Sequence, residues 1–413
     1  MKGRLSLKYG MRLKATMMSK LDDLILELCP DGVEYTSLGD IASDVFRGSG
    51  ITRDQVTLTG TPCVRYGEIY TTYGIWFEKC ISHTNAAIIP NKKYFEHGDI
   101  LFAITGESVD EIAKSCAYVG YEKCLAGGDI VVLKHNQEPK YISYALSTLQ
   151  AQMQKSKGKI KSKVVHSSVP AIKEIRIPLP PLPIQREIVR ILDTFAELTA
   201  ELTAELTARK KQYEHYREKL FAINGKNKFV LLGDVCKISR GRVMSKEYLR
   251  DNSGEYPVYS SQTANNGIFG YIKSFDYEDE SITWTTDGAN AGSVFYHSDE
   301  KFSITNVCGL LRVKNKNEMN TKYIYYALQI VAKGYVYSGM GNPKLMSNIM
   351  GKIRIPQKSI EEQQYIVAIL DRFDKLTNDL TIGLPAEIEA RRKQYEYYRD
   401  KFLTFKEKAH EQL

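Results

Sequence analysis

Residues 185–195 read Gln-Arg-Glu-Ile-Val-Arg-Ile-Leu-Asp-Thr-Phe, and residues 363–373 read Gln-Gln-Tyr-Ile-Val-Ala-Ile-Leu-Asp-Arg-Phe. The two stretches share Gln, Ile, Val, Ile, Leu, Asp and Phe at the same relative positions, 178 residues apart. Each follows an Ile-Arg-Ile-Pro tetrapeptide, which begins at Ile175 and at Ile353. This period is far longer than the roughly 20–50 residues of a solenoid unit, so the sequence predicts one duplicated module of domain plus helix.

A second repeated segment follows each of these stretches. Residues 209–219 read Arg-Lys-Lys-Gln-Tyr-Glu-His-Tyr-Arg-Glu-Lys, and residues 391–401 read Arg-Arg-Lys-Gln-Tyr-Glu-Tyr-Tyr-Arg-Asp-Lys, now 182 positions later. The second copy is therefore longer between its two conserved segments. Gly383 and Pro385 fall in that interval, which predicts that the second helix bends or restarts there.

The first copy has the apolar spacing of a long amphipathic helix. We expect it to run from Ile188 to Ala222, over roughly 50 Å. Apolar residues recur there every three or four positions, at Ile188, Ile191, Leu192, Phe195, Leu198, Leu202 and Leu206. Within it, Thr-Ala-Glu-Leu occurs twice in tandem at residues 199–206. Two such stripes in one chain predict an antiparallel helix pair, and a coiled-coil interface with a second molecule is the alternative.

The segments before each helix have the short apolar runs of β-rich domains. Strands are expected at residues 99–105, 129–133 and 281–285, and helices at residues 18–28, 141–153 and 322–328. The two domains share an outline, because Leu-Gly-Asp followed by Arg-Gly occurs in both. The predicted fold is α+β, with two β-rich domains in a pseudo-two-fold arrangement, joined and separated by two long antiparallel helices. The expected boundaries are 1–17 (disordered leader), 18–176, 177–227, 228–354 and 355–413.

Size and charge restrict the possible functions. The chain has 413 residues and a net charge of +8, which suits a polyanionic partner. Its seven cysteines include no Cys-x-x-Cys pair, so we expect reduced thiols and no metal site. No apolar run approaches the length of a membrane span, and the basic leader lacks the apolar core of a signal peptide. These features predict a soluble cytoplasmic protein whose natural start is either Met1 or Met18.

With these repeats, the chain resembles the specificity subunit of type I restriction-modification systems. The tandem Thr-Ala-Glu-Leu is similar to a spacer repeat that marks one subgroup of that family. The resemblance implies a non-catalytic subunit in which each β-rich domain recognises one half of a bipartite, asymmetric DNA target. It also implies that two methyltransferase subunits dock on the helices and methylate adenine N6, and that restriction motor-nuclease subunits join them. S-adenosylmethionine, ATP and Mg²⁺ would then be bound by these partners.

Missing motifs agree with a subunit that has no catalytic residues. The Gly-Lys pairs that begin at residues 158, 225 and 351 are followed by Ile, Asn and Ile, so none forms a phosphate-binding loop. The chain also lacks the Asn/Asp-Pro-Pro-aromatic motif of adenine methyltransferases. A self-sufficient nuclease or methyltransferase is therefore not expected.

Candidate DNA-binding residues lie in two loops and at two matched arginines. Alternating lysines in the first domain can neutralise phosphates, and a Gly-rich loop in the second allows close backbone approach. A groove-facing arginine can pair with guanine, although matched positions argue equally for a shared structural role. An ordinary solvated loop is the alternative for the lysines. The candidates are Arg47, Lys155, Lys157, Lys159, Lys161, Lys163, Arg240, Asn342 and Lys344.

Candidate residues for methyltransferase docking lie on the repeated helical segments. Identical surfaces would bind two identical subunits, but the tyrosines could instead pack the helix pair. The candidates are Arg209, Lys210, Tyr213, Tyr216, Arg217, Arg391, Arg392, Tyr395, Tyr398 and Arg399. The alternative for the whole protein is a coiled-coil scaffold whose two globular domains bind a protein or another non-DNA ligand.

Overall fold

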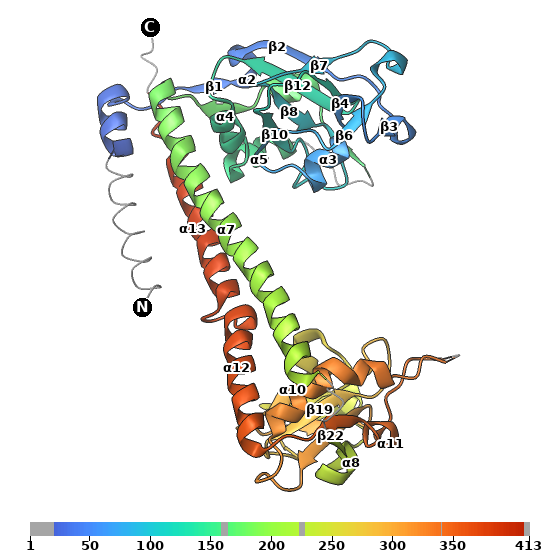
Figure 1. Cartoon of the computed structure of the whole chain (residues 1–413). Helices are drawn as coiled ribbons and strands as arrows, with labels where there is room; N and C mark the ends of the chain where they lie inside the picture. Colours follow the sequence, from blue (N-terminus) through green and yellow to red (C-terminus); the bar gives the residue numbers. More distant parts are fainter. Residues whose placement is uncertain (1–19, 158–163, 223–227, 340, 409–413) are drawn as a thin grey trace. The chain divides into compact units, whose positions relative to one another are not determined.

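A computed structural model of the chain describes residues 20–157, 164–222, 228–339 and 341–408. The chain divides into unit 1, residues 1–201 and 389–413, and unit 2, residues 202–388. One continuous helix, α7 (Leu182–Phe221), contributes its first half to unit 1 and its second half to unit 2 (Figure 1). Its 40 residues correspond to about 60 Å, somewhat longer than the sequence predicts. The expected leader, residues 1–17, lies outside the described residues.

The globular part of unit 1 contains two five-stranded sheets. In spatial order, the first is β2 (Ala42–Arg47), β12 (Ile130–His135), β8 (Ile100–Ala103), β10 (Ser115–Tyr118) and β5 (Trp76–Phe77). The second is β3 (Val56–Thr57), β6 (Ser82–Thr84), β4 (Thr61–Val64), β11 (Cys124–Ala126) and β7 (Tyr94–Phe95). The predicted strands at residues 99–105 and 129–133 are confirmed in outline. β8 and β10 are buried along their whole length, so both strands contribute to the domain core.

Shorter elements complete unit 1. Two small ladders pair β1 (Tyr35–Ser37) with β14 (Arg176–Pro178), and β9 (Thr105–Gly106) with β13 (Val165–His166). The helices are one at residues 20–28, α2 (Leu38–Ile41), α3 (Tyr66–Thr71), α4 (Pro139–Leu146), α5 (Leu149–Ser156) and α6 (Val169–Lys173). The single helix predicted at residues 141–153 is wrong. The Thr148 side chain accepts a hydrogen bond from the Ala151 amide and starts a new helix there.

Unit 2 repeats this plan with fewer strands. Its main sheet has the order β16 (Cys236–Arg240), β22 (Cys308–Val313), β19 (Ser281–Thr285) and β20 (Val294–His297). A second sheet has the order β18 (Ile268–Ile272), β17 (Tyr256–Tyr259) and β21 (Ser303–Ile304), and β15 (Phe229–Leu231) pairs with β23 (Arg354–Pro356). The helices are α8 (Leu232–Val235), α9 (Lys246–Asp251), α10 (Thr321–Val331) and α11 (Ser347–Met350). The predicted strand at residues 281–285 and helix at 322–328 are confirmed.

The repeated glutamine fixes each domain to its own helix. Gln185 Oε1 accepts a hydrogen bond of 3.1 Å from the amide of Glu138, just before α4. In unit 2, Gln363 Oε1 accepts one of 2.8 Å from the amide of Asn320, just before α10. Both side chains are fully buried, so the unpaired donor at each helix start is satisfied by the spacer rather than by water.

The repeated aspartate makes a second attachment. Asp193 accepts hydrogen bonds from Tyr144 (2.7 Å) and Lys140 (2.8 Å) of α4. The matching Asp371 accepts bonds from Tyr326 (2.6 Å) and Lys322 (2.9 Å) of α10. The glutamine and the aspartate that recur in the two stretches therefore attach each domain to its helix, and we call these attachments the joints.

A helix pair lies within each unit. In unit 1, residues 389–402 of α13 (Leu384–Phe402) run antiparallel to the start of α7, and Phe195 stacks on Tyr398 at 5.4 Å (Figure 1). In unit 2, the end of α7 packs on α12 (Ile360–Asn378), where Tyr216 stacks on Phe373 at 5.7 Å. The predicted interruption before Pro385 is confirmed, because α12 ends at Asn378 and α13 begins at Leu384. Among the described residues, no helix is long and apolar enough to cross a membrane.

Candidate nucleic-acid interface

The two predicted DNA-binding loops enter the fold at equivalent positions. In unit 1, Thr105 pairs with His166, and the lysine-rich segment immediately precedes this ladder. In unit 2, Asp287 pairs with Lys344, and residues 337–343 precede that bridge. The amide of the next residue then bonds to the strand end in both units, Ser167 to Ile104 and Leu345 to Thr286. Different loops are thus carried on one shared framework.

The predicted DNA-binding side chains of these loops that the structure describes, apart from Lys155, are exposed. Lys159, Lys161 and Lys163 lie outside the described residues. Lys157 is exposed, as are Asn342 and Lys344 in the loop of unit 2. Tyr337, which the sequence did not single out, is 74% exposed in the same loop and offers a ring that can contact a nucleic acid. In the sequence, the nearby Gly339, Gly341 and Pro343 indicate a loop, and this could have marked Tyr337 as an exposed candidate.

The two matched arginines make different contacts. Arg47 Nη2 forms an ion pair of 2.5 Å with Asp129, and its Nε donates to the carbonyl of Gly128. Arg240 Nη2 donates one hydrogen bond of 3.2 Å to the neutral hydroxyl of Thr286. The guanidinium of Arg47 is therefore held by a carboxylate, whereas Arg240 keeps a neutral partner that it can exchange for a base or phosphate at lower cost.

The glycine after each arginine has a packing role. A Cβ at Gly48 would collide with the backbone of Gly127, and one at Gly241 with the backbone of Ile304. At this point the strand leaves the main sheet and passes against the second sheet. The repeated Arg-Gly pair is thus explained in part by a close backbone approach common to both domains.

The prediction that Lys155 belongs to the DNA-binding loop is wrong. It lies on α5, is 5% exposed, and its Nζ donates a hydrogen bond of 2.8 Å to the carbonyl of Leu146. Burial lowers the pKa of Lys155 to about 7, because the charged ammonium loses its hydration. A side chain enclosed in this way cannot contact a phosphate, so Lys155 is not part of the candidate interface.

This burial makes the stability of unit 1 depend on pH. Between pH 7 and about 10.4, unfolded Lys155 binds a proton that the folded protein lacks, so stability rises with pH in this window. We expect Lys155→Met to remove that rise and to stabilise unit 1 at pH 6 on the order of 5 kcal/mol. Thermal unfolding of the parent and the variant at pH 6 and pH 9 measures this change in stability. Lys157→Met, an exposed neighbour, is the matched control and should leave the pH profile unchanged.

The tyrosines predicted for methyltransferase docking mainly pack the helices. Tyr213 is 7% exposed and packs on Phe373, so its prediction as a docking residue is wrong. Tyr395 and Tyr398 are half-buried, and burial raises the pKa of Tyr395 to about 12. Tyr216 keeps 39% exposure. The tyrosine rings of this repeat therefore pack between the two helices of each pair.

The cationic side chains of the same segments differ in exposure, because Lys210 and Arg392 are exposed whereas Arg217 and Arg399 are partly buried. Arg209 pairs with Glu205 at 3.3 Å, Arg392 with Glu389 at 3.0 Å and Arg399 with Asp400 at 2.7 Å. Lys210 is exposed, Arg391 donates to Gln394, and Arg217 donates to Gln329. Such surface pairs stabilise little, so these side chains can exchange partners when another protein binds.

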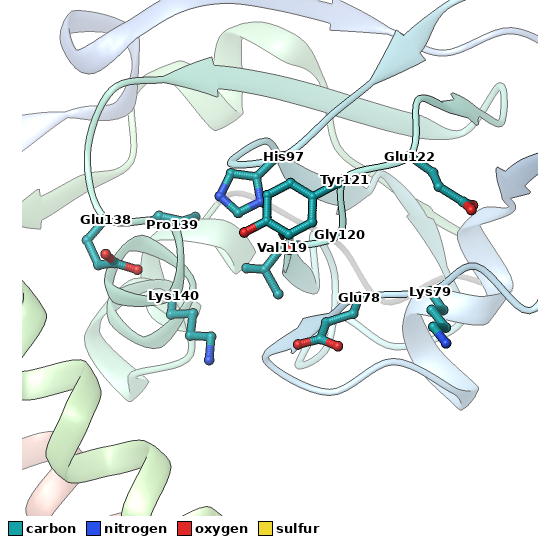
Figure 2. A pocket seen from close by; sticks show the side chains of 10 residues that line it. All are labelled: Glu78, Lys79, His97, Val119, Gly120, Tyr121, Glu122, Glu138, Pro139 and Lys140. Atoms are coloured by element: carbon teal, nitrogen blue, oxygen red, sulfur yellow. Dashed lines mark hydrogen bonds between the residues drawn. The ribbon is translucent and has the colours of Figure 1, made fainter.

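Two cavities lie among the described residues of unit 1. One of about 390 Å³ adjoins the lysine-rich segment and is lined by residues that include Tyr66, Tyr70, Thr105, Glu107 and Val164. The other, of about 530 Å³, is lined by residues that include Glu78, His97, Tyr121, Glu138 and Lys140 (Figure 2). His97 stacks on Tyr121 at 4.9 Å, and no predicted site residue lines this second cavity. Within the described ranges, no cluster of His, Cys, Asp and Glu could hold a metal ion.

Comparison with known proteins identifies the repeated framework. The family described as Type I restriction modification DNA specificity domain matches residues 30–209 and 224–390, once for each copy of the module. The chain belongs to this family. The recognition of a non-catalytic type I specificity subunit is thereby confirmed. Its place in the subgroup with a Thr-Ala-Glu-Leu spacer repeat stays a prediction.

Individual relatives are also described as type I specificity subunits. A putative type I specificity subunit of Mycoplasma pneumoniae is 43% identical over 244 residues, which is 57% of this chain and 98% of the relative. A putative specificity subunit of Haemophilus influenzae is 35% identical over 270 residues, covering 60% of this chain and 68% of the relative.

Solved structures support the predicted fold class. The S subunit of a type I restriction-modification system from M. genitalium has a TM-score of 0.57 and 18% identity, over 90% of this chain and 96% of its own. The HsdS subunit from Thermoanaerobacter tengcongensis has a TM-score of 0.52 and 17% identity, over 91% and 97%. At these identities the likeness concerns the fold.

Proposed function

We propose that the chain is the DNA specificity subunit of a type I restriction-modification complex that recognises a bipartite, asymmetric target. The observation that carries this proposal is the contrast between shared and unshared parts. The joints made by Gln185 and Gln363 are alike, whereas the loops on the shared framework, a lysine-rich segment and residues 337–343, differ in sequence. Two similar domains with unlike loops suit a target with two unlike halves.

We assign one half-site to each domain. Residues 18–176 and 228–354 form the recognition domains, and residues 177–227 and 355–413 form the helical spacers. Lys157, Lys159, Lys161 and Lys163 contact phosphates in the first half-site, with Arg47 in a mainly structural role. Arg240, Asn342 and Lys344 contact DNA in the second, where an arginine and an asparagine can contact base edges and a lysine can contact phosphate.

The partners follow from the repeated helices. Two methyltransferase subunits dock on the cationic faces around Arg209, Lys210 and Arg217 and around their copies Arg391, Arg392 and Arg399. The complex then positions restriction subunits on the same DNA, in the cytoplasm. A scaffold that binds a non-DNA ligand has no specific observation in its favour.

Methylation mapping tests this proposal. The chain is co-expressed with its cognate methyltransferase subunit in a host without adenine methylation, and N6-methyladenine is located by single-molecule sequencing. We expect one split motif with a fixed gap and two different halves. The required control is the same methyltransferase shown active with another specificity subunit. In that case, no new methylation would contradict the proposal.

A further inference from the structure

Three short chain segments pair side by side at the end of β19 in unit 2. Lys344 pairs with Tyr337 through two backbone hydrogen bonds of 2.9 and 3.0 Å, and it pairs with Asp287 on its other side. Residues that stand directly opposite in antiparallel strands direct their side chains to the same face. Asp287, Lys344 and Tyr337 therefore form one row of side chains across the three segments, which we call the row of unit 2.

Tyr337 is the aromatic end of this row. Its side chain is 74% exposed, and within the described ranges its ring stacks on no other ring and its hydroxyl has no hydrogen-bond partner. The preceding residue, Val336, has an extended backbone and packs against the core of unit 2. Side chains alternate along an extended segment, so the backbone directs Tyr337 to solvent. Packing within the described part of the domain therefore does not explain this ring.

A close backbone contact fixes the position of the ring. A Cβ added at Gly339 would lie 2.4 Å from Cε1 and from Oη of Tyr337, so only glycine leaves room for the ring there. Together with the backbone pairing to Lys344, this contact holds the hydroxyl end of the ring against the loop. An exposed side chain that is already held in one position loses little conformational entropy when it contacts a ligand.

The equivalent pair in unit 1 has a different chemistry. There Thr105 pairs with His166, and Thr105 Oγ1 lies 3.2 Å from His166 Nδ1, so the two side chains bond to each other. In unit 2, no ion pair joins Asp287 to Lys344 among the described residues, and Asp287 is partly buried with its Oδ1 enclosed. The exposed groups of the row of unit 2 are therefore the Lys344 ammonium and the Tyr337 ring.

A cation beside an apolar ring suits the edge of the DNA major groove. The ammonium can neutralise a phosphate, whereas the ring has apolar surface to bury. Among the base-edge groups of the major groove, the C5-methyl group of thymine is the apolar one, and apolar side chains read thymine by contact with it. Contact of the ring with this methyl group would give the half-site a base preference that the charge of Lys344 alone cannot supply.

We propose that the Tyr337 ring recognises a thymine of the half-site read by unit 2, by contact with its C5-methyl group, while Lys344 contacts a neighbouring phosphate. This inference rests on the proposed function, because it assigns one base contact within the site of unit 2. It makes Tyr337 a specificity-determining residue in addition to Arg240.

Replacement of thymine by uracil tests this contact, because it removes only the methyl group. The purified complex of the chain with its cognate methyltransferase subunit is given synthetic duplexes in which each thymine of the mapped target, on either strand, is replaced in turn, and kcat/KM for methyl transfer is measured. We expect replacement at one position to lower kcat/KM roughly fourfold, the effect of one buried methyl group. Tyr337→Ala should abolish this difference between thymine and uracil, and Tyr337→Phe should retain it. Tyr397→Ala, at a 62% exposed tyrosine on α13, is the matched control and should also retain it.

Three results would overturn the proposal. The first is that no thymine replacement lowers methylation, and the second is a thymine–uracil difference that Tyr337→Ala leaves unchanged. The third is an equal loss of activity on all duplexes with Tyr337→Phe, which would show that the hydroxyl contacts a phosphate. In each of these cases the parent complex still methylates a split target, so the proposed function stands. A parent complex that methylates no split target overturns the proposed function and this inference with it.

Discussion

Deletion of residues 203–206, one Thr-Ala-Glu-Leu repeat, is expected to change the gap between the two half-sites while leaving the bases of both halves unchanged. Four residues shorten α7 by about 6 Å, which corresponds to at most about two base pairs of DNA. The deletion also turns the rest of the helix by about 40° beyond one full turn. Methylation of the original target should fall to background, and mapping of N6-methyladenine should show the new gap.

Substitution without deletion is the control for this experiment. Thr203→Ala together with Glu205→Gln keeps the helix length and removes the surface ion pair of Glu205 with Arg209. Because such a pair stabilises little, the gap should stay as it is in the parent protein. If the deletion altered bases within a half-site instead of the gap, the helix would not determine the spacing.

Arg240→Ala is expected to relax the specified base at one position of the half-site that unit 2 recognises. A bidentate arginine–guanine contact discriminates by about 1–3 kcal/mol, or roughly 5–150-fold. Arg240 is exposed, and its described partner is the neutral Thr286 hydroxyl, so its guanidinium can exchange that partner for a base at low cost. Mapping should show the same motif and gap with one degenerate position, and Arg240→Lys should relax that position too because lysine lacks the planar fork.

Arg47→Ala is the matched control in unit 1. Its guanidinium is held by Asp129 and Gly128, so its loss should lower stability slightly and leave the first half-site unchanged. A motif altered by Arg47→Ala and unaltered by Arg240→Ala would reverse the assignment. Together the two variants distinguish base recognition from a structural role, the two alternatives that the sequence left open for these arginines.

The sequence predicted the architecture well because the architecture is periodic and repeated. The helix stripe from Ile188 to Leu206 and the break before Pro385 depend on local spacing and backbone chemistry, which any reader of the chain can count. The duplication then identified the family without knowledge of a single tertiary contact. The joints of Gln185 and Gln363 explain why those particular residues recur.

The individual site residues were harder to predict because burial is a tertiary property. Lys155 alternates with small residues as a surface lysine would, but its backbone lies on α5 and its Nζ donates hydrogen bonds to Ser115 Oγ and the Leu146 carbonyl. Tyr213 stands in a strongly charged segment and is nevertheless enclosed by α12. Which face of a helix is covered depends on a partner helix far away in sequence, and composition carries no record of it.

The two joints also bear on how this kind of protein can diversify. Each recognition domain is held by a backbone amide just before a helix and by a Tyr–Lys pair on that helix, and the spacers meet both with Gln and Asp. Recombination that brings in a foreign domain with the same three anchors would preserve these bonds. A new half-site could then be acquired in one genetic step, without any change in the surfaces that assemble the complex.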